Sequence, residues 1–196
     1  MTSREAVQHD SPVALILIDV INDFQFEQGG RLAKYALPMA RNLVRLKREA
    51  KRRGIPCLYV NDNFDQWRSD FRHLVARCIR HGECGASIAR LLAPDRDDYF
   101  VLKPMHSGFY RTPLDVLLLK LGAKKLILCG LTTDSCVLFT ANDAYLRDFE
   151  ILVPEDCSTA LSKRRHAHAL GQMRNTLHAD TNASRKIDFA RLLRAE

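Results

Sequence analysis

The chain has 196 residues, of which 46% are hydrophobic, and a formal net charge of +7. This length and composition fit one globular domain, residues 1–196, and leave little room for a second. The polar start and the lack of long apolar runs argue against a signal peptide or a membrane-spanning helix, so we expect a cytoplasmic protein that does not bind membranes. The six irregularly spaced cysteines are then expected to be reduced thiols.

The excess of basic residues lies in stretches where charged and apolar residues alternate at helical spacing. Two of them read ARNLVRLKREAKRRG and LSKRRHAHALGQMRN. A solvated helix face has this pattern. No nucleic-acid-binding motif accompanies the charge, so we expect no nucleic-acid partner.

Short apolar runs without polar alternation predict strands that are buried on both faces of a parallel sheet. In chain order the runs are 13–18, 55–60, 99–102, 125–130 and 150–154. The helical patterns between them are at about 38–53, 70–93, 113–121, 135–148 and 162–178. Pro38 and Pro113 mark predicted first turns, while Gly54 and Gly122 follow predicted helix ends. A short sixth strand is predicted near 180–184, and KIDFARLLRAE predicts a last helix.

Strand and helix alternate along nearly the whole chain. This predicts an α/β fold, a three-layer α/β/α sandwich with a mostly parallel, Rossmann-like sheet of five to six strands. The ligand crevice of such a sheet opens at the carboxyl ends of the strands, where the strand order reverses. Asp19 ends the first predicted strand, Lys103 ends the third, and Cys136 follows the fourth in the loop GLTTDSCVLF. We expect these three side chains to meet.

Cys136 is a candidate nucleophile. A helix N-terminus and a nearby ammonium group both favour the thiolate. Thr133 or Asp134 is the predicted N-cap, which puts Cys136 in the first helical turn, and Lys103 supplies the charge. Asp19 would take the thiol proton and later return it to a leaving amine, so the reaction would pass through a thioester. From spacing alone, a structural role for each residue remains the alternative.

Three blocks of the sequence resemble the isochorismatase-like cysteine hydrolases, which include nicotinamidases, N-carbamoylsarcosine amidases and ureidoacrylate amidases. The blocks are LILIDVINDF, VLKPMHSGFYRTPLDVLL and LILCGLTTDSCVLFTANDAYLRDFEILVPEDCSTA, and the resemblance covers about residues 12–179. It implies a catalytic triad of Asp19, Lys103 and Cys136. It also implies a non-proline cis peptide between Leu131 and Thr132, and an oxyanion hole made by the backbone N–H groups of Thr132 and Cys136. Relatives often have alanine where this chain has Thr132.

The resemblance also suggests which aromatic residues line the substrate pocket. Phe24 and Tyr110 match positions that face the substrate in relatives, and Phe109 and Trp67 are further candidates. An aromatic residue of an α/β domain is as often part of the core as of a pocket wall.

The metal-binding Asp-x-His pair of nicotinamidases is incomplete in this chain. The stretch VNDNFDQWRSDFRHL has Asp62 but no histidine two positions later, and His73 stands alone. The spacing of Cys78, His81 and Cys84 offers three ligands where a structural zinc normally needs four. We therefore expect no metal site and no cofactor.

The expected function is hydrolysis of a C–N bond in a small amide, ureide or carbamoyl compound through a thioester on Cys136. One alternative is isochorismatase-type cleavage of a vinyl ether, in which Asp19 protonates the substrate and no covalent intermediate forms. A second is a non-catalytic small-molecule binding protein of the same fold, against which the intact triad argues. Relatives are commonly homo-oligomers, so a dimer or tetramer is expected.

Overall fold

The apolar runs form the strands of one parallel sheet. The computed structural model describes residues 10–62, 70–80 and 85–194. Its strands are β1 (Val13–Ile18), β2 (Cys57–Asp62), β3 (Tyr99–Lys103), β4 (Lys125–Leu131), β5 (Glu150–Leu152) and β6 (Ser158–Thr159). The sheet order is β3-β2-β1-β4-β5, with β6 beside β4, and all five ladders are parallel. The predicted sheet is confirmed.

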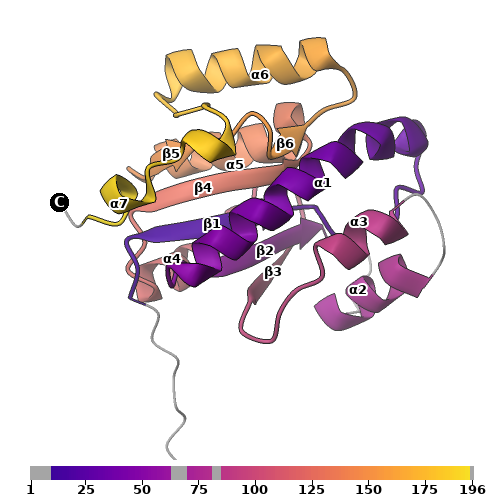
Figure 1. Cartoon of the computed structure of the whole chain (residues 1–196), viewed down its shortest axis with the longest axis horizontal. Coiled ribbons are helices and arrows are strands. Elements are labelled where there is room, and N and C mark those ends of the chain that lie inside the picture. The colour runs from indigo at the N-terminus through magenta and orange to yellow at the C-terminus, as the bar shows by residue number, and fades with distance from the viewer. Residues whose placement is uncertain (1–9, 63–69, 81–84, 195–196) are drawn as a thin grey trace, which may run out of the picture.

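Helices cover both faces of this sheet (Figure 1). One core cluster joins the sheet to α1 (Gly29–Arg52), α2 (Phe71–Arg80), α3 (Ala86–Leu91) and α7 (Phe189–Leu192). The other joins it to α4 (Leu114–Lys120), α5 (Leu138–Tyr145) and α6 (Lys163–Thr176). Alternate residues of β1 enter the two clusters because successive side chains of a strand point to opposite faces. Burial on both sides explains why β1 shows no polar alternation.

Several predicted boundaries were wrong. Pro38 lies inside α1 rather than in its first turn, because the apolar face of this helix already begins at Leu32 and continues past the proline to Met39. The predicted helix at 70–93 is two helices, α2 and α3. The second begins after Gly85, where an added Cβ would lie 2.0 Å from the carbonyl oxygen of Asn22. The backbone at Gly85, where α3 begins, therefore lies close against the backbone at Asn22.

The end of the chain also differs from the prediction. The sixth strand is β6 at 158–159, whereas residue Asp180 forms only an isolated bridge with Leu152. A short 3₁₀ helix, η2 (Ser184–Lys186), precedes the four-residue α7, which is the α-helical part of the predicted last helix among the residues described up to 194. The expected turn glycines are confirmed: Gly54 and Gly122 have φ values of 72° and 71° directly after helix ends.

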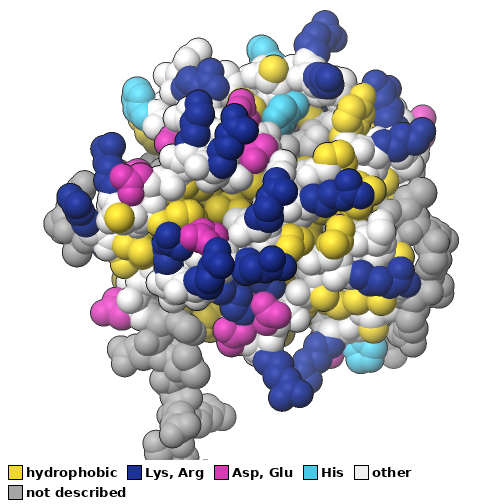
Figure 2. Space-filling model, viewed as in Figure 1, with side chains coloured by type: hydrophobic (Ala, Val, Ile, Leu, Met, Phe, Trp, Pro, Cys, Tyr) yellow, Lys and Arg dark blue, Asp and Glu magenta, His cyan; other side chains and the backbone are white. Residues whose placement is uncertain are grey.

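Basic side chains are spread over the surface with acidic ones among them (Figure 2). On α1 the buried residues are almost all apolar, with Lys47 the one buried charge, and the other basic residues are partly or fully exposed. This is the predicted solvated helix face. In the part of the chain that the structure describes, no helix has the length and apolar character needed to cross a membrane.

Candidate active site

Three strands end next to one another at the carboxyl edge of the sheet. Asp19 directly follows β1, Asp62 ends β2, and Lys103 ends β3 in register with Asp62. The chain runs outward from β1 to β3 and then returns to β4, so the strand order reverses between β1 and β4. The ligand crevice of an open parallel sheet lies at such a point.

Lys103 and Asp19 form a buried ion pair. The Nζ atom of Lys103 lies 2.9 Å from Oδ2 of Asp19 and 3.8 Å from the carboxylate of Asp62, and it donates a hydrogen bond of 3.1 Å to the carbonyl oxygen of Met105. The other oxygen of Asp19 accepts the backbone N–H of Asp62 at 2.7 Å. The side chains of Lys103 and Asp19 are 0% and 9% exposed, so both charges are compensated inside the protein.

The backbone of Asp19 has a left-handed conformation, with φ of 51°. Its N–H group still donates to the carbonyl oxygen of Val60 at 3.0 Å, so the residue is held by β2. Few non-glycine residues adopt a positive φ, and aspartate is among those that do. Such residues are often found at functional sites.

Cys136 lies in the first turn of the helix that follows β4, as predicted. A π-helical segment, η1 (Thr133–Val137), leads directly into α5. The Sγ atom of Cys136 accepts a hydrogen bond of 3.5 Å from Nζ of Lys103. Of the five described cysteines, Cys136 alone is partly exposed while the other four are buried, and all five are free thiols. The peptide bond between Leu131 and Thr132 is cis.

The predicted N-caps of this helix were wrong. Thr132 is the cap residue, and it makes no side-chain capping bond. The side chain of Thr133 is turned toward α6, where its Oγ1 lies 2.8 Å from Nδ1 of His166, and Asp134 forms an ion pair with Arg165. Burial lowers the pKa of His166, so its ring is neutral at neutral pH. Both side chains therefore bind the helix to α6 instead of capping it.

The predicted thiolate is also wrong, because burial outweighs the lysine charge. Burial and the Asp19 carboxylate raise the pKa of Cys136 to about 12, although Lys103 lowers it. Burial also raises the pKa of Asp19, partly offset by Lys103. For Lys103 itself, burial lowers the pKa, but the neighbouring anions more than reverse that effect, so it stays protonated. The resting sulfur is a neutral thiol that must lose its proton during attack.

His106 is a neighbour of Cys136 that the sequence reasoning missed. Its Nδ1 atom lies 3.8 Å from Sγ of Cys136, and its ring packs on Phe139 with 5.4 Å between ring centroids. The available signal was its place three residues after Lys103 in the second of the three blocks.

The four predicted pocket aromatics differ in their surroundings. Phe109 is 3% exposed and packs against Phe149, so its ring offers little surface to a substrate. Phe24 is also buried, with a φ of 58° just after the strand end, and Tyr110 is 48% exposed. Trp67 lies outside the described residues. Pocket roles for Phe24 and Tyr110 stay predictions.

One acidic cluster within the described residues has the spacing of a metal site. It consists of Asp95, Asp97 and Asp98 in the loop before β3. Lys51 forms ion pairs of 2.9, 2.6 and 3.0 Å with these three carboxylates, so a lysine already compensates their charge. Of the stretch 61–73, residues 63–69 are outside the described part of the chain.

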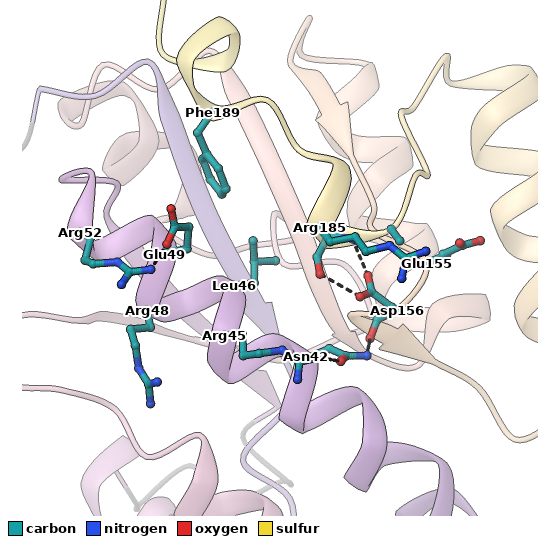
Figure 3. Close-up of a pocket in the computed structure, with 12 residues that line it drawn as sticks. Asn42, Arg45, Leu46, Arg48, Glu49, Arg52, Glu155, Asp156, Arg185 and Phe189 are labelled. Carbon is teal, nitrogen blue, oxygen red and sulfur yellow. Dashed lines mark hydrogen bonds and ion pairs between the residues drawn. The ribbon is translucent and has the colours of Figure 1, made fainter.

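A separate groove of about 720 Å³ lies between the second half of α1 and the segment around η2 and α7 (Figure 3). Arg45, Arg48 and Arg52 of α1 line it together with Phe189. None of the three residues of the predicted triad does. The groove is therefore not part of the site at the strand ends.

Comparison with known proteins agrees with the geometry. Residues 13–183 match the family model described as the Isochorismatase domain. The chain is 37% identical over 174 residues to an uncharacterized isochorismatase family protein, YaaI, of Bacillus subtilis, which covers 89% of this chain and 95% of that protein. It is 30% identical to a probable inactive nicotinamidase of Arabidopsis thaliana, over 83% of this chain and 88% of that protein.

Solved structures share the fold. An N-carbamoylsarcosine amidase from Thermoplasma acidophilum is 27% identical and superposes with a TM-score of 0.70, over 90% of this chain and 98% of that one. A pyrazinamidase/nicotinamidase from Streptococcus mutans is 28% identical with a TM-score of 0.68, and the match covers 86% of this chain and 99% of that one. The family match, the shared fold and the strand-end cluster lead to one conclusion: the chain belongs to the isochorismatase family of hydrolases.

Proposed function

We propose that the protein hydrolyses a C–N bond of a small amide, ureide or carbamoyl compound through a thioester on Cys136. The observation that carries the proposal is the contact of one lysine with both other members of the triad. Nζ of Lys103 is 2.9 Å from Asp19 and 3.5 Å from Sγ of Cys136. A nucleophile, an acid–base group and a fixed positive charge thus share one strand edge.

Asp19 is the proton acceptor in the first step. The thiol of Cys136 is neutral at rest, because burial and the neighbouring Asp19 carboxylate raise its pKa, and its proton passes to Asp19 as the sulfur attacks the substrate carbonyl carbon. Protonated Asp19 then gives the proton to the leaving nitrogen as the C–N bond breaks. Lys103 stabilises the negative charge that develops on sulfur and carboxylate.

The backbone N–H groups of Thr132 and Cys136 are the proposed oxyanion hole. Both belong to the turn between β4 and α5, where the backbone is fixed by its neighbours: Ser135 and Val137 donate to the carbonyl oxygen of Thr132 at 3.0 and 3.2 Å. Fixed donors of this kind are worth about 3 kcal/mol each toward the transition state.

One observation keeps a second candidate, the cleavage of a vinyl ether. Burial raises the pKa of Asp19, and a raised pKa favours the protonated carboxyl group, which is the form that could give a proton to carbon. In that reaction Asp19 protonates the substrate and Cys136 has no covalent role. A test must therefore ask whether turnover depends on the thiol.

The test measures ammonia release from a panel of small primary amides and ureides. We expect the wild type and a Cys78→Ala control to release ammonia and Cys136→Ala to release none. Vinyl ether cleavage is measured in parallel with isochorismate. If Cys136→Ala still cleaves isochorismate and no amide gives ammonia, the second candidate replaces the proposal. If the protein binds these compounds but turns over neither kind, it is a binding protein.

A further inference from the structure

We propose that His106 is the catalytic base of the second half-reaction, in which water releases the acyl group from Cys136. This inference rests on the proposed thioester. The imidazole is exposed and its Nδ1 atom is 3.8 Å from Sγ, so it touches the reacting atom from a position that water reaches freely. Lys103, which donates to this sulfur, and Asp19, whose charge acts on it, are both buried.

Asp19 is poorly placed to activate water as well. One of its oxygens accepts the N–H of Asp62 at 2.7 Å, and the other is paired with Lys103 at 2.9 Å. Its side chain is only 9% exposed. An incoming water would have to compete with these contacts at a carboxylate that faces the protein interior. The side chain of His106 is exposed, and its contacts with Sγ of Cys136 and the ring of Phe139 leave the residue accessible to water.

The loop that carries His106 is fixed on both sides of the residue. On one side the carbonyl oxygen of Met105 accepts a hydrogen bond of 3.1 Å from Nζ of Lys103. On the other side the N–H of Gly108 donates to Oγ1 of Thr140 at 3.0 Å. An added Cβ at Gly108 would lie 2.9 Å from a methyl group of Val60, so the loop lies close to β2.

The same contacts connect the loop to the nucleophile. The hydroxyl of Thr140 donates to the carbonyl oxygen of Cys136 at 2.7 Å while it accepts the N–H of Gly108. Phe139, which packs on the His106 ring, lies one helical turn after Cys136. The imidazole and the thiol are thus held by one helical segment, and little reorganisation is needed during the reaction.

The step balances with water as the only added reactant. In the tautomer that carries its proton on Nε2, the Nδ1 atom of His106 is free to accept a proton. Water gives a proton to Nδ1 while its oxygen bonds to the acyl carbon of the thioester. The tetrahedral intermediate then breaks the C–S bond, the carboxylic acid leaves, and the imidazolium proton passes to the sulfur. When the proton that passes to sulfur is the one on Nδ1, the free thiol and the starting tautomer of His106 are both restored.

The test separates acylation from deacylation with 4-nitrophenyl acetate as the probe. Stopped-flow absorbance follows the first equivalent of 4-nitrophenolate and then the steady state, and intact mass spectrometry follows acetyl-Cys136. In His106→Asn we expect an unchanged first-turnover rate, a steady-state rate lower by about 10²-fold, and accumulation of the acetyl enzyme. His168→Asn, an exposed histidine on α6, is the matched control and should behave like the wild type.

His106→Phe keeps a ring next to Phe139 and should show the same accumulation, which separates proton transfer from packing. A His106→Asn protein that deacylates at the wild-type rate would overturn the inference. So would an equal loss of both phases, since that pattern indicates a structural role. Failure of the thioester proposal looks different: the wild type would then give no acetyl-Cys136, and Cys136→Ala would match its rate.

Discussion

At Cys136 the neighbouring Asp19 carboxylate raises the pKa of the thiol. Burial is the larger cause of the raised pKa, and the Asp19 charge is the next. In the proposed mechanism the same residue thus opposes thiolate formation at rest and takes the proton when the substrate is attacked. Removing its charge should separate these two effects.

Asp19→Asn is expected to speed alkylation of Cys136 while it stops catalysis. Without the carboxylate the thiol pKa falls, so more thiolate is present at neutral pH and iodoacetamide reacts several-fold faster. Asparagine cannot carry the proton, so amide turnover should drop by about 10² to 10⁴. Alkylation rates by mass spectrometry and ammonia release give the two readouts.

The control for this substitution is Asp148→Asn, because Asp148 is exposed and asparagine tolerates its φ of 61°. It should leave both rates unchanged. Slower alkylation of Asp19→Asn would contradict the electrostatic explanation, and wild-type turnover would remove Asp19 from the mechanism.

The sequence was sufficient to predict that Asp19, Lys103 and Cys136 meet, because strand ends of a parallel sheet lie at one edge, and the structure brings them together. Their catalytic roles were implied by the family resemblance and stay predictions. The thiolate prediction failed because the balance between burial and two opposite charges depends on distances that spacing does not give. His106 was missed because no rule assigns a role to a single exposed histidine.

At the scale of elements, α5 and the loop after β3 are joined through the hydroxyl of Thr140. This residue is fully buried and links Gly108 to Cys136. Thr140→Val keeps the shape but leaves the buried N–H of Gly108 without its acceptor. We expect the free energy of unfolding to fall by about 1–3 kcal/mol, measured by urea denaturation.

Thr140→Ser keeps the oxygen and serves as the control, so its loss should be smaller than that of the valine variant. If serine proved as costly as valine, packing of the methyl group would matter more than the hydrogen bonds. The methyl group of Thr140 lies near Gly108: a Cβ built on this glycine would be 3.5 Å from the methyl carbon, which is an ordinary van der Waals distance.

Replacement of glycine by alanine is expected to have opposite effects on stability at two positions. At Gly130, in β4, φ is 118° and an added Cβ would lie 2.0 Å from the carbonyl oxygen of Ile18 in the neighbouring strand. At Gly171, in α6, nothing lies within 4 Å of the added Cβ. Gly130→Ala should cost about 3 kcal/mol or more, and Gly171→Ala should add about 1 kcal/mol of stability. Thermal unfolding of the two variants checks this, and equal effects would contradict it.

The spacing of apolar residues predicted which helices and strands form better than it predicted the residues at which they begin and end. Strand positions were predictable because burial on both faces removes polar residues from β1 and β4. The start of α1 was not, because a proline was read as a helix start although packing on the sheet holds the helix on both sides of Pro38. The division of 70–93 into α2 and α3 depends on a long-range contact at Gly85.

At the scale of the whole molecule, an ion-pair network joins the end of α1 to the loop before β3. Lys51 binds Asp95 and Asp97 there, and its hydrogen bonds are the main reason that the pKa of each carboxyl is lowered. A lowered folded-state pKa adds stability above the unfolded value of about 4, and this stability is lost as the pH falls through the folded value.

Lys51→Met should therefore lower the melting temperature at pH 7, and this effect should shrink as the pH is lowered toward about 2.5, because protonation of the carboxyl groups removes the ion pairs. Solvent screens the exposed pairs, so we expect about 1 kcal/mol or less from each. Differential scanning calorimetry at both pH values measures the difference. Lys34→Met, at an exposed position of the same helix, is the control, and a difference that persists in acid would contradict the ion-pair explanation.

The sheet order has a consequence for how activity returns when the protein folds. The site joins Asp19 to the backbone of Asp62 across 43 residues of chain, and Lys103 to Cys136 across 33. Parallel neighbours of this kind have high contact order, and chains with high contact order fold slowly. Any continuous fragment that contains Asp19, Lys103 and Cys136 spans residues 19–136 and therefore includes all of β2, β3 and β4. Recovered hydrolysis should thus lag behind helix formation and serve as a late reporter of the assembled sheet.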